Sequence, residues 1–173
     1  MKRNIVFAAI FSLFVLALSA SAQTTDFSGT WTLDLSKSKL GERNNIESQT
    51  LAVVQTAKDI TVTPATKRAA PPAGGGGGRM GGGMGGDNPT TYNLDGKAVE
   101  TEMQSQMGLM KMTTKAKLDG GKLEITRTMA TPMGDRTSTE TWWINADKTL
   151  TIESSRPNRE GGTDTTTRVF TKS

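Results

Sequence analysis

A strict alternation of apolar and polar residues near the start of the chain constrains the fold more than any other feature. Between Phe27 and Leu35, Gly29 and the apolar residues take every second position, and polar residues take the positions between them. Successive side chains of a β-strand point to opposite faces of the sheet, so this period of two is typical of a strand with one buried face. Similar stretches recur along the chain, separated by short turns. The sequence therefore predicts an all-β protein.

About ten such stretches follow one another at intervals near ten residues, a spacing typical of a β-sandwich or a β-barrel. Asp95-Gly96 is the strongest hairpin signal among the turns between them. Because each turn joins neighbouring strands, and a meander with unpaired ends exposes its edges, closure is the simplest arrangement. We expect an antiparallel up-and-down meander of about 8–10 strands that closes into a barrel. Its first strand, Phe27–Leu35, should pair with its last, Thr163–Lys172.

The first 22 residues have the features of an export signal. A basic start that contains Lys2 and Arg3 precedes the apolar run from Ile5 to Leu18, and small residues end at Ala22. This order is typical of a signal peptide, and the apolar run is shorter than the roughly 20 residues that a membrane span needs. We expect residues 1–22 to be removed and residues 23–173 to form a single β-barrel domain. The protein should be periplasmic or secreted, without stable membrane insertion after cleavage.

The sequence contains no cysteine and no histidine. Disulfides, common zinc sites and the usual Ser-His-Asp or Cys-His arrangements are therefore excluded. The net charge of +4 includes Lys2 and Arg3 of the leader, and the other basic residues alternate with acidic ones. This pattern favours a solvated surface over nucleic-acid binding. We expect a monomer without a cofactor.

Residues 69–88 interrupt the strand pattern with a run rich in glycine. Such a segment has almost nothing to bury, so we expect a disordered loop between two strands. A phosphate-binding loop is excluded because no Gly-x-x-x-x-Gly-Lys-Ser/Thr motif is present.

Two short motifs resemble a known class of barrels. Gly29-Thr30-Trp31 resembles the Gly-x-Trp motif that begins the first strand of calycin barrels, the lipocalins and fatty-acid-binding proteins. Residues 167–170 are similar to the last strand of fatty-acid-binding proteins, with Phe170 where those proteins have Tyr. A closer resemblance, through 36–38 and 147–152, is to exported bacterial lipocalin-like proteins without an established activity. In lipocalins a basic residue of the last strand packs on the first-strand Trp, which implies here that Arg168 lies over Trp31.

Apolar and hydroxyl side chains on the expected inner face could line a cavity. A small hydrophobic ligand would then contact residues from four strands: Met110, Met112, Ile125, Trp142 and Leu150. The alternative is an interior that side chains fill completely, in an envelope structural or interaction protein without a ligand.

Four methionines fall within ten residues: Met103, Met107, Met110 and Met112. Clustered thioethers could hold Cu(I), which prefers soft ligands, although flexible methionines also fill irregular barrel interiors. Four glutamates, Glu100, Glu102, Glu124 and Glu140, could in principle pair for glycoside chemistry. We expect them instead to be exposed partners of Lys and Arg on the outer face, and we expect the protein not to be an enzyme.

Overall fold

The computed structural model describes residues 25–41, 44–69, 87–105, 108–131, 134–158 and 161–173, with the backbone alone at 103–105 and 108. The expected signal peptide at 1–22, most of the glycine-rich segment 69–88, and Met107 lie outside the described residues. Within the described ranges no helix is long and apolar enough to cross a membrane.

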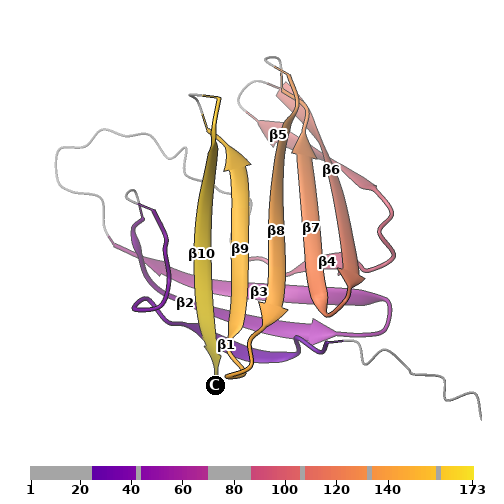
Figure 1. Ribbon diagram of the computed structural model, residues 1–173. Coiled ribbons are helices and arrows are strands. Elements are labelled where there is room, and N and C mark those ends of the chain that lie inside the picture. Colours follow the sequence, from indigo (N-terminus) through magenta and orange to yellow (C-terminus); the bar gives the residue numbers. More distant parts are fainter. Residues whose placement is uncertain (1–24, 42–43, 70–86, 106–107, 132–133, 159–160) are drawn as a thin grey trace, which may run out of the picture.

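The described chain is an antiparallel meander of ten strands, as the alternation predicted. The strands are β1 (Gly29–Leu33), β2 (Ile46–Gln55), β3 (Asp59–Arg68), β4 (Thr90–Asn93), β5 (Val99–Ser105), β6 (Gly108–Asp119), β7 (Lys122–Met129), β8 (Arg136–Ile144), β9 (Leu150–Pro157) and β10 (Thr163–Lys172). Their order in the sheet is β4-β3-β2-β1-β10-β9-β8-β7-β6-β5. In Figure 1 the sheet folds over, so that β1 to β4 run across the lower ends of β6 to β10.

The first and last strands pair, as expected. Trp31 is opposite Lys172 and Leu33 is opposite Phe170 in an antiparallel ladder between β1 and β10. The segment after β1 continues along β10, where Asp34 donates a backbone hydrogen bond to Val169 and Lys39 exchanges two with Thr167. This contact joins the two ends of the chain into one continuous sheet.

The ladder does not close fully, which corrects the expectation of a closed barrel. Strands β4 and β5 are the two edges of the sheet, and no ladder joins them in the described residues. After β4, which pairs with β3, the chain crosses to the edge of β6. There Asp95 forms a β-bridge with Lys117, and the amide of Gly96 donates a hydrogen bond to the carbonyl of Ala116. The chain itself therefore spans the seam at the lower end, and the two layers diverge above it (Figure 1).

The hydrophobic core fills the space where the two layers cross. Phe27 is fully buried in it, with its ring edge-on to Trp142 at a centroid distance of 6.2 Å. The carbonyl of Phe27 accepts a hydrogen bond from Trp31 Nε1, and its amide donates to Gln55. The other large, fully buried side chains come from both layers: Trp31, Ile60, Leu123, Ile125, Leu150, Ile152 and Phe170.

Candidate functional site

A layer of polar side chains lies inside the fold, directly above the hydrophobic core. Arg127 follows the buried Ile125 by two positions, and Arg168 precedes the buried Phe170 by two. Glu140 precedes the buried Trp142 by two. Alternate residues of a strand share a face, so all three side chains point inward. We call this set, with Gln49, Tyr92 and Ser154, the interior polar layer.

Two arginines of this layer share one carboxylate. Glu140 Oε1 is 3.5 Å from Arg127 Nη1 and 3.4 Å from Arg168 Nη2. The three side chains are 14%, 20% and 19% exposed for Arg127, Arg168 and Glu140, so solvent screens their charges only partly. With two cations and one anion, the layer carries an excess positive charge.

The remaining contacts come from neighbouring strands. Arg127 donates to the Tyr92 hydroxyl from β4, and its guanidinium lies 5.4 Å from the Tyr92 ring centroid. Arg168 donates to Gln49 Oε1 and to Ser154 Oγ, each at 3.4 Å. Strong N–H···O bonds are 2.7–3.2 Å long, so Arg168 is held by several long contacts and retains the capacity to donate to another acceptor.

Arg127 stays charged in this environment. Burial acts to lower the pKa of Arg127, but the charge of Glu140 and the contact with Tyr92 outweigh it and hold the pKa above its ordinary value. An arginine with a raised pKa is protonated at every physiological pH. Arg127 is therefore a permanent donor of hydrogen bonds within the layer.

The expected ligand-contacting residues lie on two sides of the interior polar layer. Ile125, Trp142 and Leu150 are at most 3% exposed and belong to the packed core below it. Met110 and Met112 are half-buried above it, on the part of β6 beyond the crossing of the layers. The polar residues between them were missed as a site, although the same alternation that identified Ile125 and Trp142 also places Arg127 and Glu140 inside.

No family model matches the chain, and no curated protein matches it. Among solved structures, the wild-type fluorescent protein UnaG superposes with a TM-score of 0.53 at 16% identity, over 85% of this chain and 97% of that one. A point mutant of UnaG gives a TM-score of 0.52 at 16% identity, over 85% and 96%. The fold is calycin-type. Zebrafish ileal bile acid-binding protein complexed with cholic acid was also found, with a TM-score of 0.44 at 18% identity, over 85% and 98%.

The calycin-type motif residues are arranged differently from the expectation. The cation over the Trp31 ring is Lys172, with Nζ 5.3 Å from the ring centroid, and not Arg168. The strand register explains why Lys172 makes this contact, because Trp31 is directly opposite Lys172. Arg168 precedes Lys172 by four residues and lies in the interior polar layer.

The structure describes only some of the methionines of the proposed Cu(I) cluster, and it places three of the four glutamates on the outer face. The backbone of Met103 pairs with that of Met110, but the Met103 side chain and all of Met107 lie outside the described residues. Glu100, Glu102 and Glu124 are exposed, as expected. Glu140 is not, because its strand position faces the two arginines. The described ranges contain no group of three His, Cys, Asp or Glu that could hold a metal ion.

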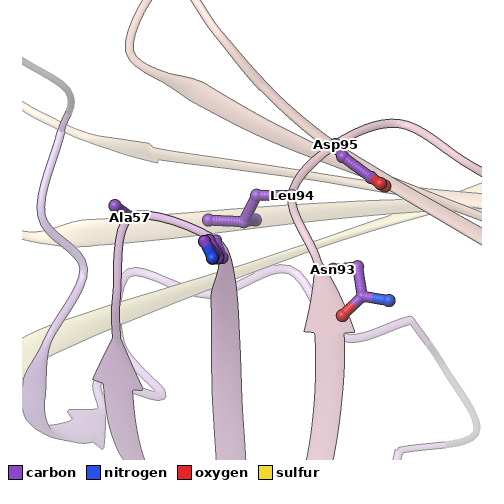
Figure 2. A pocket seen from close by; sticks show the side chains of 5 residues that line it. Ala57, Asn93, Leu94 and Asp95 are labelled. Atoms are coloured by element: carbon purple, nitrogen blue, oxygen red, sulfur yellow. The ribbon is translucent and has the colours of Figure 1, made fainter.

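Two shallow hollows lie at the other end of the calycin-type fold, beside the turn between β2 and β3. The larger has a volume of about 340 Å³ and is lined by 57–58 and 93–95. Figure 2 shows Leu94 beside Ala57, with Asp95 further from the turn. The Asp95 carboxylate is engaged by Lys97. The hollow is lined by one cation, Lys58, and one anion, Asp95, and so has no excess charge, which leaves the interior polar layer as the stronger candidate site.

Proposed function

We propose that the protein binds a small organic molecule with an apolar body and an anionic end, without a catalytic role. The single observation that carries this proposal is the pair of inward-facing arginines that share Glu140 and leave an excess positive charge inside the fold. An anionic end group would balance that charge and accept hydrogen bonds from both guanidinium groups.

The surroundings of the layer support an amphipathic ligand. Above it, half-buried methionines of β6 and β7 offer flexible apolar contacts. Below it, the packed core leaves the ligand no room to go deeper, because Leu150, Phe170 and Leu123 are fully buried. The anionic end would therefore point toward the core, and the apolar body would lie between the diverging layers.

Binding of a fluorescent aromatic sulfonate dye, followed by displacement with bacterial lipid extract and mass spectrometry, tests the proposal. Arg168→Gln should weaken dye binding about tenfold or more, because a hydrogen bond to a charged group contributes about 1.5–3 kcal/mol. Lys115→Gln is the matched control, since Lys115 is an exposed cation on the outer face of β6. No dye binding, or equal binding by the Arg168 variant and the wild type, would contradict the proposal.

The filled core favours one second candidate, an envelope interaction protein without a ligand. Eight large side chains are less than 2% exposed, and both hollows lie outside the fold at a turn. A protein recovered free of small molecules that also fails to bind the dye would support this candidate.

We also propose that the mature protein is exported and begins at Gln23. The signal-like sequence of residues 1–22 supports this step. N-terminal sequencing of protein from periplasmic and extracellular fractions tests it. Recovery only of a cytoplasmic chain that begins at Met1 would contradict it.

A further inference from the structure

Three methionines lie on one inward face at the upper end of β6 and β7. Met112 is directly opposite Met129 in the ladder between these strands. Met110 precedes Met112 by two positions on the same face of β6. Ala116, on that face of β6, and Ile125, on that face of β7, are buried in the core, which fixes the face as the inner one.

The spacing allows the three sulfur atoms to meet. Directly opposed residues of antiparallel strands have Cβ atoms about 4.5–5.5 Å apart, which applies to Met112 and Met129. Met110 and Met112 are about 6.6 Å apart along β6, because each residue advances the strand by about 3.3 Å. Methionine has three rotatable side-chain bonds, so the thioethers of all three residues can turn toward one point between them.

These three methionines are less tightly packed than the side chains of the hydrophobic core. The core below consists of branched and aromatic side chains that are almost fully buried. Met110, Met112 and Met129 are each only half-buried, at the level where the two layers have diverged. Each of the three side chains is therefore partly open to solvent.

Thioether sulfur atoms bind some metal ions and not others. A thioether is a neutral, soft ligand that suits Cu(I), whereas Mg²⁺, Ca²⁺ and Zn²⁺ need oxygen, imidazole or thiolate ligands. The sequence has no histidine and no cysteine, so no stronger soft ligand competes. Arg127, two residues before Met129 on this face, pairs with Glu140 at 3.5 Å, and a neutral thioether ligand set adds no charge to the layer.

We propose that Met110, Met112 and Met129 bind one Cu(I) ion through their three sulfur atoms. This site goes beyond the proposed binding of an organic anion, because it uses thioethers above the interior polar layer and none of the guanidinium groups.

Anaerobic Cu(I) titration of the full chain against a chromogenic competitor tests the site, with Ag(I) as a redox-inert probe. We expect one equivalent bound with micromolar or tighter affinity. The triple variant Met110→Leu, Met112→Leu and Met129→Leu should lose at least about tenfold in affinity, since even outer-shell changes at metal sites cost about 10- to 100-fold. In NMR spectra with labelled methionine methyl groups, Ag(I) should shift the signals of these three residues.

Two further variants make the outcome specific. Met80→Leu with Met84→Leu removes two thioethers elsewhere in the sequence and should leave the affinity unchanged. Arg168→Gln should also retain Cu(I), so failure of the organic-ligand proposal and failure of this one are distinguishable. Near-UV circular dichroism of the tryptophans verifies that each variant is folded. Binding weaker than micromolar, Cu(II) bound as tightly as Cu(I), or an unchanged affinity in the folded triple variant would overturn the proposal.

Discussion

Gly29 makes room for the contact between Lys172 and Trp31. Its φ of +133° lies in a region that side chains rarely adopt, and a Cβ there would lie 2.6 Å from Lys172 Cε. The ammonium group of Lys172 is 5.3 Å from the Trp31 ring centroid. The backbone conformation at this position therefore favours the glycine of the Gly-x-Trp motif, whereas the flexible end of the Lys172 side chain could move away from a Cβ.

Gly29→Ala should destabilise the protein by about 1–3 kcal/mol, because strained backbone persists only where its surroundings impose it. The free energy of unfolding in urea, followed by tryptophan fluorescence, measures this cost. Lys172→Gln removes the cation without backbone strain and should cost about 0.5–1 kcal/mol. If the two variants cost the same, the strain at Gly29 is not the main effect.

Individual residues differ in how well the sequence predicts their positions. Alternation identified the strand faces correctly, including the inner positions of Ile125 and Trp142. Glu140 was expected on the outer face as an exposed partner of Lys and Arg, but it faces inward, where two arginines from other strands compensate the cost of burying its charge. That compensation depends on the pairing of β7, β8 and β10, which no local pattern contains.

Aspartates hold several of the turns between elements. After β1, Asp34 accepts hydrogen bonds from the amide and hydroxyl of Ser36. Between β8 and β9, Asp147 does the same for Thr149, where Lys148 has a φ of 63°. The side-chain hydrogen bonds of Ser36 and Thr149 are the main causes that hold the pKa of Asp34 and Asp147 below the ordinary value of 3.8.

These shifts predict loss of stability in acid. A carboxyl group whose pKa is lower in the folded than in the unfolded state stabilises the fold above the unfolded pKa of 3.8, and this contribution is lost as the pH falls through the folded pKa. The thermal midpoint should change little between about pH 5 and 8, since the chain has no histidine. At pH values lower than about 4, the midpoint temperature should decrease. The double variant Asp34→Ala and Asp147→Ala should show a smaller acid loss; an equal loss would contradict this cause.

The segment before β1 closes the lower end of the fold. Phe27 is fully buried, and the side chain of Gln55 binds both its amide and the carbonyl of Thr25. Phe27, which lies before β1 and close to the expected cleavage point, is therefore part of the core.

Phe27→Ala should cost about 3–5 kcal/mol in the free energy of unfolding, which is typical for loss of a buried aromatic ring. Val54→Ala is the control, because Val54 is 64% exposed and should change the stability by less than about 0.5 kcal/mol. Urea denaturation of both variants measures the difference. A cost for Phe27→Ala close to that of the control would show that the segment does not contribute to the core.

At the scale of the whole molecule, the interior changes in character from the crossing of the layers outward. Apolar residues of both layers come first, then the interior polar layer, and then the methionines of β6 and β7. The ten strands and the β1–β10 pairing were predictable from alternation and turn spacing. The open seam was not, because it depends on the chain at 94–96 changing its partner from β3 to β6.

Glu140→Gln should raise the affinity for the anionic dye about tenfold, because it removes the carboxylate that competes with the ligand for both arginines. The same change should lower the stability by about 1–3 kcal/mol, since it leaves two partly buried cations less compensated. Dye titration and urea unfolding measure the two effects. Glu124→Gln, an exposed glutamate on the next strand, is the matched control. A weaker dye affinity in the Glu140 variant would contradict this account of the site.

The pairing of β1 with β10 also has a consequence during synthesis. The hydroxyls of Thr32 and Ser173 meet across a sequence separation of 141 residues. A chain made from its N-terminus onward cannot form this ladder until β10 has been added. Strand β1 can pair with β2 in the meantime, but its other edge stays free. The sheet therefore cannot be completed before β10 has been synthesised, although β1, β2 and β3 can already be paired with one another.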